Sequence, residues 1–196
     1  MRKIVKLDRA HVWHPFTQMR DWMKADPVVI RSGRGAVLAD DRGRKFLDGN
    51  SSIWTNLHGH NHPVINAAIR GQLGKVAHSS ALGLANEPAS LLAEKLVKLA
   101  RPAASVATAS SASPLGDNPA LTKVFYSDDG STAMEVALKL SHEATRRTGG
   151  KSRFLSLNGA YHGDTVGAVS LGHIDLFHKA YGGLLFPAAK VMAPCC

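Results

Sequence analysis

Two short segments of this sequence carry residues that could bind an anion beside a flat ring. The first is Gly130-Ser131-Thr132, where an apolar run ending in Asp128-Asp129 gives way to a helical spacing of apolar residues. The N–H groups that begin a helix have no partner within it, and the helix macrodipole adds partial positive charge. Glycine lets an anion approach the backbone, and the two hydroxyls can donate further hydrogen bonds. This hinge is therefore a candidate phosphate site.

The same residue types also fit a purely structural role. Thr132 and Glu135 have the spacing of a capping box, in which Thr132 caps the helix and Glu135 bonds back to it. The segment lacks the lysine of a Walker loop and the glycine pattern of dinucleotide-binding folds. The carboxylates of Asp128-Asp129 would also repel a phosphate. Taken alone, the hinge leaves the capping and phosphate interpretations both open.

The second segment is "NGAYHGDTVGAVSLG", which places Tyr161 and His162 between glycines after the next apolar run. In an α/β sheet, ligands usually bind at the carboxyl ends of the strands, so Tyr161 could stack on a heterocycle beside the phosphate. Each residue also has a structural alternative, Tyr161 at the edge of a core and His162 in a loop. Asp164 could serve acid–base chemistry or cap the helix expected near Val166. Together the two segments predict a phosphorylated aromatic cofactor.

The elements that must position these segments follow from the apolar spacing. An α/β fold with a parallel sheet is predicted, because strand, turn and helix alternate from Lys123 onward. The expected strands there are "KVFYS" and "RFLSL", with "LLF" and "KVMA" as further apolar runs, and the expected helices are a segment from Pro63, Glu87–Leu99, Ser131 to about Thr148, and a short helix around Val166–Leu171. Earlier, glycine-separated runs at Val28–Ile30, Ala36–Leu38 and Lys45–Leu47 predict a small antiparallel meander.

Composition excludes several classes of protein. The 196 residues, 44% hydrophobic and 20% charged, suit a soluble globular protein of one or two domains. No apolar run is long enough for a membrane span, and the first residues do not form a targeting segment, so a cytoplasmic protein is expected. The net charge of +9 is scattered, without an aromatic-flanked basic stripe, which disfavours nucleic acid as a partner.

Metal binding and disulfide chemistry are also disfavoured. The two cysteines are the adjacent pair Cys195-Cys196, which makes neither a disulfide framework nor a zinc site. His58, His60 and His62 alternate in a way that could collect a metal on one strand face. The intervening glycine and asparagine and the following Pro63 instead favour a turn into a helix.

Four segments together resemble the class III pyridoxal-phosphate aminotransferases. They are "HVWHPFTQM", "DGNSSIWTNLHGHNHP", "FYSDDGSTAMEVALK" and "NGAYHGDTVGAVSLG", in the family's order and spacing. The resemblance implies a fold-type I transferase of the α/β class. It divides the chain into an N-terminal segment with the meander and a substrate loop, residues 1–62, and the start of the large cofactor domain, residues 63–196. A flexible insert rich in Ala, Ser and Pro is expected over 101–120.

The resemblance also implies roles for particular residues. The cofactor, pyridoxal 5′-phosphate, would be bound by the two segments described first, at Gly130, Ser131, Thr132, Tyr161 and His162. Aromatic segments near the N-terminus would line the substrate site, at Phe16, Ile53 and Trp54, together with Tyr161. Many relatives have Tyr in place of Phe16, Trp in place of Ile53, and a neutral residue in place of Asp129, so contacts to substrate and phosphate are expected to differ here.

The family's Schiff-base lysine is expected to be missing from this sequence. In the family it lies far along the chain, and neither Lys179 nor Lys190 stands in its context. We therefore expect an N-terminal piece of an aminotransferase, with no catalytic residue of its own and no activity alone.

Several functions stay open for the complete protein. Within the family the resemblance is strongest to the enzymes of biotin synthesis, which implies 8-amino-7-oxononanoate and an amine donor, S-adenosylmethionine or lysine, as substrates of a homodimer. The alternatives are a class III aminotransferase for another ω-amine, such as ornithine or 4-aminobutyrate, and a non-catalytic remnant.

Overall fold

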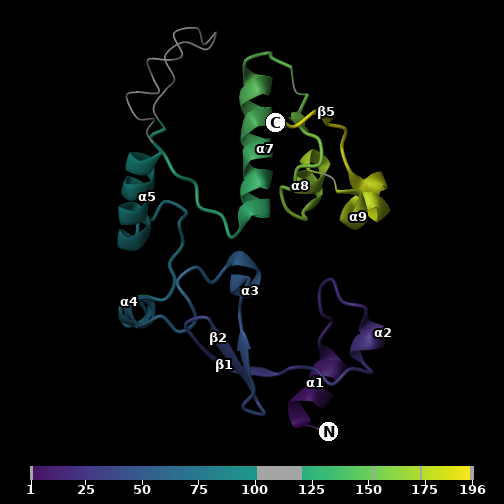
Figure 1. The fold of residues 1–196 in the computed structure, drawn as a ribbon. Helices are drawn as coiled ribbons and strands as arrows, with labels where there is room; N and C mark the ends of the chain where they lie inside the picture. The colour runs from purple at the N-terminus through teal and green to yellow at the C-terminus, as the bar shows by residue number, and fades with distance from the viewer. Residues whose placement is uncertain (1, 101–120, 152, 173, 195–196) are drawn as a thin grey trace. The chain divides into compact units, whose positions relative to one another are not determined.

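The computed structural model describes residues 2–100, 121–151, 153–172 and 174–194 of the chain (Figure 1). Two compact units are present, Met1–Asn86 and Glu87–Cys196. The predicted insert at 101–120 and the two cysteines lie outside the described residues. The predicted division of the complete protein after residue 62 stays a prediction.

The first unit combines short helices with a three-stranded antiparallel sheet of order β1-β2-β3. Its elements are α1 (Lys3–His11), α2 (Met19–Trp22), β1 (Ile30–Arg34), β2 (Val37–Asp40), β3 (Lys45–Leu47), α3 (Ser51–Trp54) and α4 (Pro63–Leu73). The predicted meander is confirmed, although β1 begins where the first predicted run ends. Gly35 and Gly43 have φ of 56° and 79°, a left-handed conformation that glycine adopts without strain, and they make the two turns between strands. The predicted helix from Pro63 is also confirmed.

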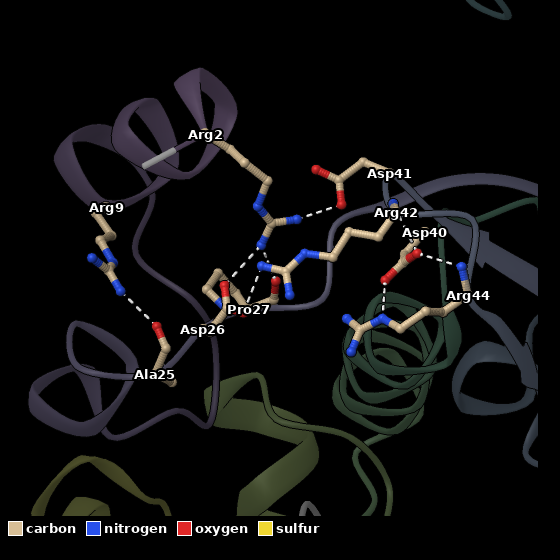
Figure 2. Close-up of polar contacts among 9 residues, drawn as sticks. All are labelled: Arg2, Arg9, Ala25, Asp26, Pro27, Asp40, Asp41, Arg42 and Arg44. Carbon is tan, nitrogen blue, oxygen red and sulfur yellow. Dashed lines mark hydrogen bonds and ion pairs between the residues drawn. The ribbon is translucent and has the colours of Figure 1, made fainter.

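Ion pairs join the start of α1 to the sheet. Arg2 bonds to Asp41 and, at 3.1 Å, to Asp26, while Arg42 bonds to the other oxygen of Asp26 at 2.6 Å (Figure 2). Asp26 thereby links two guanidinium groups that lie forty residues apart in the sequence. These contacts hold the N-terminal helix against the turn between β2 and β3. The apolar pattern of the sequence did not predict them.

A buried carboxylate anchors the same turn. The side chain of Asp40 is fully buried, and it accepts hydrogen bonds from the N–H groups of Arg42 and Arg44 and, at 2.7 Å, from the Arg44 guanidinium (Figure 2). Burial alone would raise the pKa of Asp40, but the hydrogen bonds from Arg44 and Arg42 and the charge of Arg44 together outweigh it, and the pKa lies below its usual value. The turn is therefore built around an ionised group.

The second unit contains α5 (Glu87–Leu99), α7 (Gly130–Arg147), β4 (Leu155–Leu157), α8 (Val166–Leu171), α9 (Asp175–His178), the 3-10 helix η1 (Lys179–Leu184) and β5 (Ala189–Val191). Strands β4 and β5 pair in parallel, with Leu155 opposite Ala189 and Leu157 opposite Val191. Helix α8 packs against both β4 and α7 (Figure 1). The predicted α/β alternation is thus confirmed for this pair of strands and its crossover.

The core of the second unit is small and centred on α8. Its buried apolar residues are Leu138 of α7 and Ala168, Val169 and Leu171 of α8. The helices predicted at Glu87–Leu99 and Val166–Leu171 have the bounds expected, and α7 differs by one residue at each end. None of the helices in the described ranges has both the length and the apolar character needed to cross a bilayer.

One predicted strand and one apolar run do not form strands in the described residues. Residues 123–127, "KVFYS", have no regular secondary structure and no ladder partners in the described part of the chain, and Tyr126 donates its hydroxyl to the Ala89 carbonyl at 2.6 Å. The "LLF" run enters η1 and then an irregular segment, and the strand begins later, at Ala189. A strand needs a neighbour for its N–H and C=O groups, and apolar spacing alone does not supply one.

Candidate functional site

Helix α7 begins with a capping box centred on Asp129. The Asp129 carboxylate accepts a hydrogen bond from the Thr132 N–H at 2.8 Å, and the Thr132 hydroxyl accepts one from the Asp129 N–H at 3.0 Å. The predicted box of Thr132 with Glu135 is wrong, because the helix starts at Gly130 and Asp129 takes the extended N-cap position. Since Glu135 then lies in the second turn, it does not bond back to the helix start.

Glu135 instead joins α7 to α8. Its carboxylate accepts a hydrogen bond from the Gly167 N–H at 2.8 Å, in the first turn of α8. Gly167 is buried, and a Cβ atom built on it would lie 2.4 Å from the Glu135 carboxylate. A larger residue at this position would have to displace the Glu135 carboxylate from this contact.

A cavity of about 410 Å³ lies at the start of α7. It is lined by Gly130, Ser131, Met134, Tyr161, His162 and Gly163. The two segments selected from the sequence thus meet, since the first three residues come from α7 and the last three from the loop before α8. The Ser131 hydroxyl spans them by accepting a hydrogen bond from the Asp164 N–H at 3.3 Å.

Gly163 makes this junction possible. Its φ of 110° is rarely adopted by side-chain-bearing residues, and a Cβ atom on it would lie 1.9 Å from the Ser131 hydroxyl oxygen. The sequence analysis gave Gly163 no role in the site, and it did not select Met134 as a site residue. Met134 follows Gly130 by four residues, so the helical repeat already placed both on one face.

Tyr161 is half exposed beside the cavity, and its hydroxyl donates a hydrogen bond to Asp164 at 2.7 Å. This bond to a carboxylate raises the pKa of the phenol and lowers the pKa of Asp164. Asp164 is therefore not the predicted cap of α8. The N-cap position belongs to Thr165, and the Asp164 carboxylate is turned toward Tyr161 and His178. The phenol is a hydrogen-bond donor and the carboxylate an acceptor in this pair.

Thr132 lies next to the cavity without lining it. Its hydroxyl is bonded to the Ser127 hydroxyl at 2.6 Å and to the capping box. Of the residues predicted to bind a cofactor, the structure brings Gly130, Ser131, Tyr161 and His162 to one cavity and places Thr132 behind them.

The residues predicted to line a substrate site in the N-terminal segment share an unusual backbone. Phe16, Ile53 and Trp54 all have positive φ, between 48° and 66°, and their side chains are exposed. Ile53 and Trp54 belong to a run of four such residues, Ser51–Trp54. Left-handed backbone costs a side-chain-bearing residue roughly 1–2 kcal/mol, so this turn must be held by its surroundings.

Asp48 holds this turn. Its nearly buried carboxylate accepts hydrogen bonds from the Ser52 N–H at 2.9 Å, from the Ser52 hydroxyl at 2.8 Å and from His60 at 2.7 Å. The bonds from Ser52, with the backbone one largest, lower the pKa of Asp48. His60 is thus engaged by Asp48, while Gly59 and Asn61 have positive φ and turn the chain toward α4.

Comparison with known proteins shows which protein family the chain belongs to. The profile of the family described as aminotransferase class-III matches residues 19–195, and the chain belongs to this family. The chain is 47% identical over 191 residues to an adenosylmethionine-8-amino-7-oxononanoate aminotransferase of Geobacter sulfurreducens, covering 96% of this chain and 38% of that protein. The chain thus spans less than half the length of this relative.

Solved structures agree with this assignment. A crystal structure of the adenosylmethionine-8-amino-7-oxononanoate aminotransferase from Methanocaldococcus jannaschii matches 97% of this chain with a TM-score of 0.84 and 40% identity, over 40% of its own length. An amine transaminase from an uncultivated Pseudomonas species, solved in its PLP-bound form, matches 94% with a TM-score of 0.75 and 30% identity, over 38% of its own length. The predicted fold class is confirmed: the described residues share the fold of the N-terminal part of fold-type I transaminases.

Proposed function

We propose that the cavity at the start of α7 binds the phosphate and ring of pyridoxal 5′-phosphate, and that the complete protein is an aminotransferase of biotin synthesis. The observation that carries the proposal is the meeting of Gly130 and Ser131 with Tyr161 and His162 at one cavity. Membership of the class III family and the PLP-bound relative support the same cofactor.

The residues present fit this cofactor. A cavity of about 410 Å³ lies within the range of small-molecule sites, roughly 300–1,000 Å³. The N–H groups of Gly130 and Ser131 belong to the first turn of an 18-residue helix, where no helical carbonyl can accept from them. A Cβ atom on Gly130 would meet nothing within 4 Å, which leaves the backbone open to a phosphate oxygen. The Asp129 carboxylate accepts from the Thr132 N–H, which leaves the N–H groups of Gly130 and Ser131 for the phosphate.

The protein side chains would bind and orient the cofactor. Ser131 and the first amides of α7 would hold the phosphate, and the ring of Tyr161 would lie against the pyridine face. Because its hydroxyl is bonded to Asp164, Tyr161 would contribute its aromatic face and keep its proton. When bound, pyridoxal phosphate supplies an electron sink for amino transfer.

For the complete protein we propose amino transfer to 8-amino-7-oxononanoate, with S-adenosylmethionine or lysine as the donor. The relatives named for this reaction, at 40–47% identity, support the acceptor. Phe16, Ile53 and Trp54 are the proposed substrate contacts of the N-terminal segment, since all three are exposed and have left-handed backbone. The complete protein is proposed to be a cytoplasmic homodimer, as expected from the family.

Binding of pyridoxamine 5′-phosphate to the chain tests the cofactor proposal. This probe carries the ring and phosphate but needs no lysine, so its fluorescence can be titrated directly. Ser131→Ala should weaken binding about tenfold, as expected for loss of one hydrogen bond to a charged group. Ser141→Ala, on an exposed position of the same helix, is the matched control. Equal affinity for pyridoxamine without the phosphate, or no binding of either, would overturn the proposal.

Donor and acceptor assays on the full-length gene product test the reaction. Turnover of 8-amino-7-oxononanoate with S-adenosylmethionine or lysine supports the biotin assignment. Turnover only with ornithine or 4-aminobutyrate would replace it with another ω-aminotransferase. The 196-residue chain alone is expected to show no turnover.

A further inference from the structure

A buried histidine lies behind Tyr161 and has no part in the function proposed so far. His178 ends α9, with only 3% of its surface exposed. Its ring lies nearly parallel to that of Tyr161, with 6.4 Å between centroids and 12° between planes. The Asp164 carboxylate bonds to both side chains.

The hydrogen bonds of His178 determine which nitrogen carries its proton. The Ile174 N–H donates to Nδ1 at 2.9 Å, so Nδ1 acts as an acceptor. In a neutral imidazole the proton then lies on Nε2, which faces Asp164 Oδ1 at 3.1 Å and donates to it. Asp164 Oδ2 accepts from the Tyr161 hydroxyl at 2.7 Å. The order of donation is therefore Ile174 to His178, His178 to Asp164, and Tyr161 to Asp164.

Of the three hydrogen-bonded side chains His178, Asp164 and Tyr161, only His178 is buried. The Asp164 side chain is 46% exposed and Tyr161 is 51% exposed, so either could turn into solvent if its partner were lost. His178 is packed in the protein and bonded to the backbone. The rigidity of the exposed pair must therefore come from His178, because a hydrogen bond between two exposed side chains is weakened by competition with water.

We propose that His178 is a positioning residue, which holds the Asp164 carboxylate so that Asp164 in turn fixes the Tyr161 ring at the edge of the cavity. The inference rests on the proposed cofactor role of that cavity. A ring fixed before binding loses less conformational entropy when a flat ligand stacks on it, which strengthens binding. The same contacts direct the phenol proton to Asp164.

Three variants separate this role from a purely structural one. His178→Ala removes the donor to Asp164, whereas His178→Gln restores a side-chain N–H. His142→Ala, on an exposed position of α7, is the matched control. The first readout is the ultraviolet titration of the phenol, taken as the difference from Tyr161→Phe. The carboxylate contact raises the pKa of Tyr161, so His178→Ala should move the titration toward free tyrosine, and His178→Gln should restore it.

The second readout is the dissociation constant of pyridoxamine 5′-phosphate. His178→Ala should raise it about fivefold, the loss expected from freeing one side chain, and His178→Gln should recover most of the affinity. A lower melting temperature with an unchanged phenol titration would overturn the inference and leave His178 a core residue. Because the titration needs no ligand, it tests the positioning role even if the chain binds no pyridoxamine 5′-phosphate, which would count against the cofactor proposal alone.

Discussion

The two regions that hold the candidate site residues are stabilised in different ways. In the first unit, Ser51–Trp54 form a left-handed turn, and the Asp48 carboxylate accepts hydrogen bonds from both the N–H and the hydroxyl of Ser52 in it. In the second unit, the cavity lies where α7 meets the loop before α8, and residues more than thirty positions apart are in contact there, Ser131 with Asp164 and Glu135 with Gly167. The first region adds an ionised group to its backbone hydrogen bonds, whereas the second depends on close packing.

This difference predicts which perturbation each region will not tolerate. Added volume should disrupt the cavity and leave the turn intact, while neutralisation of a carboxylate should release the turn. The four predictions that follow are ordered by the size of the expected effect.

The largest effect is expected from Gly163→Ala. The new Cβ atom would overlap the Ser131 hydroxyl, and alanine would be forced to a φ of 110°. We expect a loss of about 3 kcal/mol in the free energy of unfolding, measured by urea denaturation, from strain and overpacking together. Gly182→Ala, where a Cβ atom meets nothing within 4 Å, is the control. Equal stability of the two variants would show that the junction is not tightly packed.

Leu138→Ala should rank second. Leu138 is the buried apolar residue of α7, with 8% of its surface exposed, and its truncation leaves a cavity in the small core around α8. The expected loss is about 2–3 kcal/mol, again from urea denaturation. Leu140→Ala, at a position 62% exposed on the same helix, should change stability little. If both variants lost the same amount, the core would not lie on the α8 side.

Acid should release the turn of the first unit. The pKa of Asp48 is lowered by the bonds from Ser52, so its contribution to stability is fully present above the ordinary carboxyl pKa. That contribution is lost as the pH falls through the lower pKa of the folded state. Fluorescence of Trp54, taken as the difference from Trp54→Phe, should change as the pH falls below the ordinary carboxyl pKa of about 4.

Asp48→Asn should remove this acid transition and give the acid-like signal at pH 7. Asp21→Asn, on the exposed face of α2, should keep the transition. A transition of equal size in the Asp48 variant would mean that another group holds the turn.

The smallest effect is expected from Glu143→Gln. Glu143 pairs with Arg146 and Arg147 on the exposed side of α7, at 2.8 Å and 2.7 Å. Exposed ion pairs contribute little because water and salt screen them. The urea midpoint should stay within error of the parent chain, and a clear shift would show that this face is buried in solution.

Much of the local structure could be predicted from the sequence. Helical spacing gave the bounds of α5 and α8 and the start of α4, because each helix has an apolar face and a clear start signal. The meander followed from glycines separating short apolar runs. The strand expected at 123–127 failed because its pattern describes one strand, while a ladder needs a second.

The sequence predicted which residues form the site, but not which contacts those residues make. Gly130, Ser131, Tyr161 and His162 were selected from two segments thirty residues apart, and the structure places all four at one cavity. The predicted roles of Glu135 and Asp164 were wrong, since both were expected to cap helices close by in the sequence. Each carboxylate instead bonds to a group brought near by the packing of α7, α8 and α9.

By itself, the sequence determined the family, the helices and the residues available for binding a phosphorylated ring. These properties depend on residue types and short spacings, which local backbone physics converts directly into structure. Only the tertiary structure decided that Gly163 must be a glycine and that His178 stands behind Asp164 and Tyr161. Such contacts join distant segments, and their distances follow from how the helices pack.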